Sequence, residues 1–213
     1  MTNGNWEAMW TRGIQPGEYF DASRTEPAFQ ALLDNKNLQP PLPRGKALVP
    51  GCGRGYAVAS LVVAGFSTTG IEISKTAADT AKQYLASRDV KASILEGDFF
   101  DMDLPAYDLV FDSTFLCAID PSTRADWAKR MAALVTSGGE LVTNIFPIRP
   151  DGEPDPADGA IGTGPPYALS PRLVAGLLAP HGFEKVSLDI VPPAQRARGK
   201  EYIARWRKLL PKS

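Results

Sequence analysis

From residue 46 onward, the chain alternates short apolar runs with segments in which apolar side chains recur every three or four residues. A short apolar run predicts a buried strand, and the longer period predicts a helix. The expected strands are 47–49, 67–73, 92–96, 107–112, 140–145, 183–191 and 201–209. The expected helices are 56–64, 75–87 after the capping residue Ser74, 124–135 before Gly138-Gly139, and 171–178 after Ser170. This order predicts an α/β fold: a seven-stranded, mostly parallel, doubly wound sheet with helices on both faces.

The first 45 residues lack this alternation. They are rich in aromatic residues and turn formers, with one expected helix over 27–35 and a proline-containing connector over 38–44. A chain of 213 residues is long enough for one well-buried domain and short for two. We therefore expect residues 1–45 to form a cap on a single domain whose core is 46–213. The long Pro/Gly/Asp segment 147–166 reads as a lid or a disordered loop.

The first expected strand ends in a glycine-rich turn. Residues 46–55 read Lys-Ala-Leu-Val-Pro-Gly-Cys-Gly-Arg-Gly, so Gly51, Gly53 and Gly55 stand at alternate positions. Glycine lets the backbone turn sharply and approach a ligand closely, and doubly wound proteins open nucleotide pockets at this point. The spacing is Gly-x-Gly-x-Gly and not Gly-x-Gly-x-x-Gly, which favours S-adenosyl-L-methionine over a nicotinamide cofactor.

Polar groups also stand at the ends of the next three strands, where ligands of such sheets bind. Glu72 follows the first glycine of the turn by 21 residues, a placement suited to binding both ribose hydroxyls. Asp98 is expected to accept from an adenine amino group, with Phe99 against the ring. Asp112 and Ser113 are expected to line the floor of the methyl-donor pocket. Singly, each has a structural alternative, such as a loop carboxylate or a helix cap; together they favour a nucleotide-type site.

Composition and net charge limit the kinds of binding partner that we expect for this chain. A net charge of −1 gives no electrostatic reason to expect nucleic acid or an anionic membrane, and no apolar run approaches the ~20 residues of a membrane span. Two cysteines and one histidine suit a reduced setting and make no ordinary zinc site. We expect a cytoplasmic monomer without metal, nucleic-acid or membrane partners.

Several motifs spread over nearly the whole chain carry a family resemblance. They are Trp6-Glu7-Ala8-Met9-Trp10, Ala47-Leu48-Val49-Pro50-Gly51-Cys52-Gly53, Gly70-Ile71-Glu72-Ile73-Ser74, Phe111-Asp112-Ser113-Thr114-Phe115-Leu116-Cys117-Ala118-Ile119-Asp120-Pro121, Gly164-Pro165-Pro166-Tyr167, and Gly199-Lys200-Glu201 with Arg205-Trp206. On these residues the chain resembles the thiopurine S-methyltransferase superfamily of class I methyltransferases. Within it, the chain is most similar to the halide/thiol methyltransferases.

The resemblance implies S-adenosyl-L-methionine as cofactor and a lid that closes over it. Trp6 and Trp10 match two lid tryptophans, and Phe20 matches a third lid aromatic if the chain carries a short insertion near Gly17. Tyr167 matches a hydroxyl donor directed at the nucleophile. The structural alternatives are that Trp6 and Trp10, which share a helix face, anchor the cap in the core, and that Tyr167 is a packed loop residue.

The expected activity is methyl transfer to a small anion: halide, thiocyanate, hydrosulfide or thiol. An anion stripped of water in a closed pocket and aligned with the methyl group is a strong nucleophile. It needs no general base, and the motifs contain no histidine. The alternatives are a thiopurine or other aromatic thiol, an oxyanion of tellurium or selenium, and a non-catalytic binding protein. An amino-group methyltransferase is disfavoured because the fourth strand end lacks the Asn/Asp-Pro-Pro-Tyr/Phe pattern.

Overall fold

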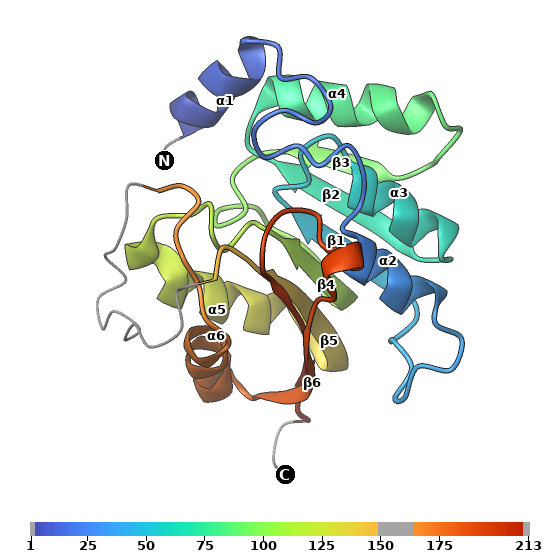
Figure 1. Ribbon diagram of the computed structural model, residues 1–213, viewed down its shortest axis with the longest axis vertical. Coiled ribbons are helices and arrows are strands. Elements are labelled where there is room, and N and C mark those ends of the chain that lie inside the picture. The colour runs from blue at the N-terminus through green and yellow to red at the C-terminus, as the bar shows by residue number, and fades with distance from the viewer. Residues whose placement is uncertain (1–2, 149–163, 211–213) are drawn as a thin grey trace.

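A computed structural model of the protein describes residues 3–148 and 164–210. Its centre is a seven-stranded sheet of order β3-β2-β1-β4-β5-β7-β6 (Figure 1). The strands are β1 Lys46–Pro50, β2 Ser67–Glu72, β3 Ser93–Glu96, β4 Tyr107–Ser113, β5 Val135–Ile145, β6 Phe183–Ile190 and β7 Tyr202–Lys208. Strands β1 to β5 pair in parallel, and β7 runs antiparallel between β5 and β6. The predicted sheet is confirmed.

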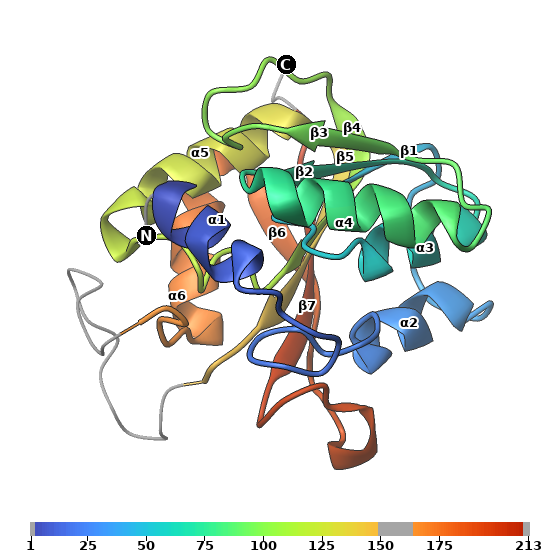
Figure 2. The ribbon, with the colours of Figure 1, turned by 90° about the horizontal axis from the view of Figure 1, so that it is seen from above.

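Helices cover both faces of the sheet (Figures 1 and 2). They are α2 Pro27–Asp34, α3 Tyr56–Val63, α4 Lys75–Ala86, α5 Arg124–Leu134 and α6 Pro171–Leu178, with short 3₁₀ turns at Pro121–Thr123, Ala179–His181 and Pro193–Gln195. Neighbouring side chains of a strand point to opposite faces, so Val110 joins the core under α5 and α6, while Phe111 joins the core under α2 and α3. The Phe111 ring stacks on Phe29 of α2 with centroids 3.6 Å apart.

Both predicted serine caps are confirmed. The Ser74 Oγ accepts from the Ala77 N–H at 3.1 Å, and the Ser170 Oγ accepts from the Leu173 N–H at 3.0 Å. Each hydroxyl satisfies a backbone donor that the first turn of a helix leaves without an intrahelical partner. The cap at Ser74 fixes the start of α4 directly after β2, beside the end of the sheet where the glycine turn lies.

The predicted helix end near Gly138-Gly139 is wrong. Helix α5 stops at Leu134, and β5 already begins at the next residue, so both glycines lie within the strand. The register between β4 and β5 shifts at this point. A Cβ on Gly139 would lie 2.8 Å from the Asp108 carbonyl oxygen. The glycine therefore allows the two backbones to approach closely at a strand irregularity.

The cap contains one further helix, α1 Asn3–Thr11, which lies beside α4 (Figure 2). The expected lid segment 147–166 falls mainly outside the described residues. Strand β1 starts at Lys46, where the core was expected to begin, and the division of the chain into cap and core stays a prediction. Over 3–148 and 164–210, no helix is long and apolar enough to cross a membrane.

Candidate functional site

The glycine turn leaves β1 with a left-handed backbone. Gly51 has φ of 55° and Gly53 has φ of 52°, a region that costs other residues free energy. A Cβ on Gly51 would lie 2.7 Å from Cδ2 of Phe115, and one on Gly53 would lie 3.7 Å from Cζ2 of Trp10. Two aromatic rings therefore cover the turn, one from the loop after β4 and one from the cap.

Glu72 ends β2 directly beside this turn. Glu72 is buried, with 6% of its surface exposed. Oε2 accepts from the Gly53 N–H at 2.9 Å and Oε1 from the Ser74 N–H at 3.2 Å. Burial raises the pKa of Glu72, and these backbone hydrogen bonds oppose the rise. Each oxygen keeps acceptor capacity for a second donor. The fold brings Glu72 to the glycine turn, and its contact with a ribose stays a prediction.

The three predicted lid aromatics lie together over the carboxyl ends of β1 and β2. Phe20 packs edge-on against Trp6 and Trp10, with ring centroids 5.6 Å and 5.7 Å away. Trp10 is 4% exposed, and the Arg54 guanidinium lies 5.6 Å from its ring centroid. Phe20 thus packs against both tryptophans, and its assignment as the third lid aromatic stays a prediction. Closure over a cofactor stays a prediction.

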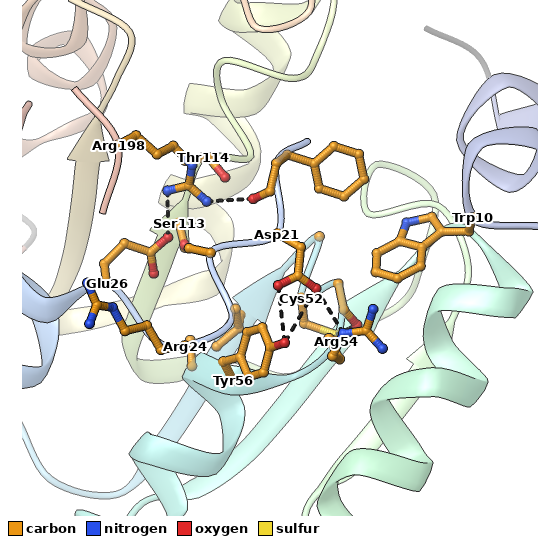
Figure 3. A pocket seen from close by; sticks show the side chains of 16 residues that line it. Trp10, Asp21, Arg24, Glu26, Cys52, Arg54, Tyr56, Ser113, Thr114 and Arg198 are labelled. Atoms are coloured by element: carbon orange, nitrogen blue, oxygen red, sulfur yellow. Dashed lines mark hydrogen bonds and ion pairs between the residues drawn. The ribbon is translucent and has the colours of Figure 1, made fainter. Parts of the chain in front are cut away.

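A pocket of about 80 Å³ lies between the cap, the glycine turn and the end of β4 (Figure 3). Trp10 and Phe20 line it from the cap, residues 51–54 from the turn, and Ser113 and Thr114 from β4 and the loop that follows. Pockets for drug-sized ligands measure roughly 300–1,000 Å³. With the cap in this position, the pocket admits a small ion or one end of a larger ligand.

Four charged side chains at this pocket form two ion pairs, each between segments that are distant in the sequence (Figure 3). The Arg54 Nε donates to Asp21 at 2.8 Å, and the Arg198 Nη1 donates to Glu26 at 3.1 Å. Arg24 also lines the pocket, and it makes no ion pair with any residue that the structure describes. Three guanidinium groups and two carboxylates line the pocket, and the Glu72 carboxylate lies beside them at the glycine turn. The exposed Arg24 is the lining group best placed to meet a negative charge.

Sequence reasoning missed these paired residues. Arg54 and Tyr56 lie in and directly after the glycine turn, and Asp21 follows Phe20, so their positions in the motifs were the available signal. Tyr56 donates its hydroxyl to Asp21 at 3.1 Å. Burial and the Asp21 carboxylate raise the pKa of Tyr56 to about 12, so its phenol is neutral. The pairs join residues 33 and 172 positions apart, which no local pattern predicts.

Asp112 at the end of β4 is 1% exposed, and the chain itself supplies its donors. Oδ1 accepts from the N–H groups of Phe115 and Leu116 at 2.9 and 3.1 Å, and Oδ2 accepts from Trp127 Nε1 at 2.9 Å. Burial raises its pKa to about 6, although all three hydrogen bonds lower it. Asp112 therefore shapes the turn after β4. Its predicted contact with the cofactor stays a prediction.

That turn presents Ser113 and Thr114 to the pocket, and the predicted contact of Ser113 with the methyl donor stays a prediction. Thr114 has φ of 65°, a left-handed conformation that is strained for a β-branched residue. Such strain persists only where the surrounding structure imposes it, and it clusters at functional sites. Here the Asp112 carboxylate imposes this backbone conformation, because it accepts from the N–H groups of Phe115 and Leu116, the two residues after Thr114.

Six predicted site residues do not line the pocket: Trp6, Glu72 and Asp112, described above, and also Asp98, Phe99 and Tyr167. Asp98 accepts from the Phe100 N–H at 2.9 Å, and Phe99 is 3% exposed, with its ring centroid 5.0 Å from that of Phe115. The Tyr167 N–H donates to the Cys117 carbonyl at 2.7 Å, which ties its segment to the loop after β4. The predicted roles of Asp98, Phe99 and Tyr167 stay predictions, and Phe99 is foremost a core residue.

The two thiols and the possible metal ligands add no chemistry here. Burial raises the pKa of Cys117 to about 12 and that of Cys52 well above its usual value, so both thiols are protonated. Within the described part of the chain, no three His, Cys, Asp or Glu side chains gather in a group able to hold a metal ion.

Known proteins resemble the chain in sequence over almost its whole length. The family model described as thiopurine S-methyltransferase matches residues 1–208. A probable thiol methyltransferase 2 of Arabidopsis thaliana is 37% identical over 97% of this chain and 86% of its own length. Thiocyanate methyltransferase 1 of Brassica oleracea is 36% identical, over 98% and 87%. The thiopurine S-methyltransferase of Vibrio parahaemolyticus is 27% identical, over 67% and 70%.

Solved structures share the fold at low identity. A protein studied for the conversion of a disulfide bond into a thioacetal group during echinomycin biosynthesis has a TM-score of 0.75 at 20% identity, covering 99% of this chain and 94% of its own. The magnesium protoporphyrin IX methyltransferase of Synechocystis, solved with bound SAM, has a TM-score of 0.68 at 16% identity, covering 96% and 91%. The fold is that of class I methyltransferases, and the chain belongs to the thiopurine S-methyltransferase family.

Proposed function

We propose that the protein transfers the methyl group of S-adenosyl-L-methionine to a small anionic sulfur nucleophile or a halide. The acceptors are a thiolate, hydrosulfide, thiocyanate or iodide, and the products are the methylated acceptor and S-adenosylhomocysteine. The observation that carries this proposal is the pairing of both carboxylates at the pocket with guanidinium groups. Each of these carboxylates is occupied by an ion pair and is not placed to take a proton from an acceptor, so the site favours an acceptor that is already an anion.

The cofactor, when bound, supplies an electrophilic methyl group on a positively charged sulfur. The residues present fit such a ligand. Gly51 and Gly53 would allow close approach of its amino-acid end, and Glu72 would accept from its ribose hydroxyls. Asp98 would accept from its adenine amino group, and the Trp6, Trp10 and Phe20 rings would cover it. The pocket of about 80 Å³ is smaller than the roughly 300–1,000 Å³ of typical ligand pockets, and we propose that the cap moves when the ligand enters.

The chain acts on the acceptor by attraction, desolvation and alignment. Arg24, which lines the pocket without an ion-pair partner among the described residues, attracts an anion. The aromatic cap excludes water, which strengthens the anion as a nucleophile. Tyr167 donates a hydrogen bond that aligns the acceptor without taking a proton. In-line geometry then lowers the barrier by holding nucleophile, methyl carbon and sulfur together.

The size of the acceptor separates this proposal from the alternatives. An iodide, hydrosulfide or thiocyanate needs less room beside the cofactor end than a thiopurine or another aromatic thiol, for which the cap has to open wider. The names of the plant relatives, thiol and thiocyanate methyltransferase, agree with a sulfur anion as acceptor.

The test is formation of S-adenosylhomocysteine by the purified protein with thiocyanate, hydrosulfide, iodide and thiophenol, each alone and in competition. We expect kcat/KM for the inorganic anions to exceed that for thiophenol. A preference for thiophenol would assign the protein to aromatic thiols. Cofactor binding without turnover of any acceptor would mean a non-catalytic binding protein.

A further inference from the structure

One carboxylate of helix α1 accepts three hydrogen bonds from the start of helix α4, in addition to the packing of the buried Trp10. Glu7 Oε2 accepts from the Ser74 hydroxyl at 2.6 Å and from the Thr76 N–H at 3.1 Å, and Oε1 accepts from the Thr76 hydroxyl at 2.6 Å. All three donors belong to the first turn of the 12-residue helix α4 or to its cap. These bonds lower the pKa of Glu7, and a negative charge at this end of a helix is favourable.

The same turn of chain holds the carboxylate proposed for the ribose. Ser74 donates its hydroxyl to Glu7 and its N–H to Glu72. Glu72 in turn accepts from the N–H of Gly53. A continuous path of hydrogen bonds thus runs from the cap helix through Ser74 and Glu72 to the glycine turn.

Trp10 connects the same helix α1 directly to the glycine turn, where the path of hydrogen bonds ends. This residue lies three positions after Glu7, and residues three apart in a helix share a face. Its ring covers Gly53, where a Cβ would lie 3.7 Å from Cζ2. The position that Glu7 takes on α4 therefore determines how Trp10 lies on the glycine turn.

We infer that Glu7 is a positioning residue that latches the cap over the bound cofactor and couples cap closure to the carboxylate of Glu72. The inference rests on the proposed function, because Glu72 and Trp10 are its predicted cofactor contacts. Glu7 itself touches no ligand in this account. It acts by holding α1 where Trp6 and Trp10 cover the site, so its loss shortens the time that the cofactor stays bound.

The experiment measures the dissociation constant and dissociation rate of S-adenosylhomocysteine, together with the Tm of the protein with and without it. The variants are Glu7→Ala, Glu7→Gln, Thr76→Val, the double variant Glu7→Ala/Thr76→Val, and Glu18→Ala as control. Glu18 is an exposed carboxylate of the same cap, and it accepts only the local Gln15 N–H among the hydrogen bonds that the structure describes.

For Glu7→Ala we expect the dissociation constant to rise about tenfold, mainly through a faster dissociation rate, from the loss of charge-assisted hydrogen bonds. Thr76→Val should weaken binding about threefold, and the double variant should bind like Glu7→Ala alone, because the two residues form one contact. Glu7→Gln should recover part of the affinity, and Glu18→Ala should bind like the wild type.

A purely structural Glu7 gives a different result. Glu7→Ala would then lower the Tm equally with and without ligand, and its dissociation constant would stay within twofold of the wild type, which overturns the inference. If Glu7→Ala does not fold, Thr76→Val with wild-type affinity overturns it. If the wild type binds no S-adenosylhomocysteine, the proposed function fails first and the inference with it.

Discussion

The change Glu72→Gln tests the core of the cofactor site, because it alters the charge of one buried side chain and hardly its shape. Glu72 holds two backbone N–H groups, one on each oxygen. A glutamine keeps one oxygen and places an amide NH₂ against the other N–H. Two donors then face each other, and one buried donor is left without an acceptor.

The expected loss of affinity follows from the hydrogen bonds that the carboxylate makes. A hydrogen bond to a charged group contributes about 1.5–3 kcal/mol. Glu72 is expected to accept two ribose hydroxyls, and glutamine retains at best one of them while losing the charge. The cofactor should therefore bind about 2–3 kcal/mol more weakly, a factor of roughly 30–150 in the dissociation constant.

Calorimetric titration with S-adenosylhomocysteine measures this directly. The matched control is Glu96→Gln, since Glu96 lies opposite Glu72 in the register of β2 and β3 and is exposed. A cofactor analogue without ribose hydroxyls should bind the wild type and Glu72→Gln about equally. Wild-type affinity for S-adenosylhomocysteine in Glu72→Gln, or an equal loss in Glu96→Gln, refutes the ribose assignment.

Three further changes probe the rest of the site. Tyr167→Phe should lower kcat about tenfold with cofactor affinity kept, through loss of one hydrogen bond to a charged acceptor; equal losses in both would make Tyr167 structural. Thr114→Gly should leave the free energy of unfolding unchanged or raise it by about 1 kcal/mol by relieving left-handed strain, yet lower kcat/KM; a clear drop in stability on denaturant unfolding contradicts this. The pKa of Asp112 is raised from 3.8 to about 6, so its stabilising contribution is fully present only below pH 3.8 and is lost as the pH rises through 6. Relative to Asp112→Asn, the wild type should therefore lose about 3 kcal/mol of unfolding free energy between pH 3 and pH 7, and parallel pH profiles from urea unfolding would disprove the shift.

Much of the fold is predictable because its signals are local. The apolar runs and their spacing predict the parallel strands. Ser74 and Ser170 mark the first turns of the helices that they cap. The glycine turn is also local, since Gly51 and Gly53 need left-handed backbone. The end of α5 was misjudged because Gly139 serves the close approach of two strands and not the end of a helix.

The site is less predictable because its chemistry depends on pairing between distant segments. Asp112 and Glu72 look alike in sequence, each an acidic residue at a strand end. In the fold, the Asp112 carboxylate accepts hydrogen bonds from its own loop and from Trp127, whereas Glu72 faces the glycine turn. The Arg198–Glu26 pair joins opposite ends of the chain, and only the assembled sheet brings them together.

The most direct test of the account is to follow the methyl group itself. The purified protein is incubated with S-adenosyl-L-methionine carrying a trideuterated methyl group and with thiocyanate or iodide, and the headspace is analysed by mass spectrometry. The account predicts methyl thiocyanate or methyl iodide three mass units heavier than the ordinary product, formed in equal amount to S-adenosylhomocysteine and nearly absent with Glu72→Gln at cofactor concentrations near the wild-type KM. S-adenosylhomocysteine binding without any labelled product, across these anions and hydrosulfide, would contradict it.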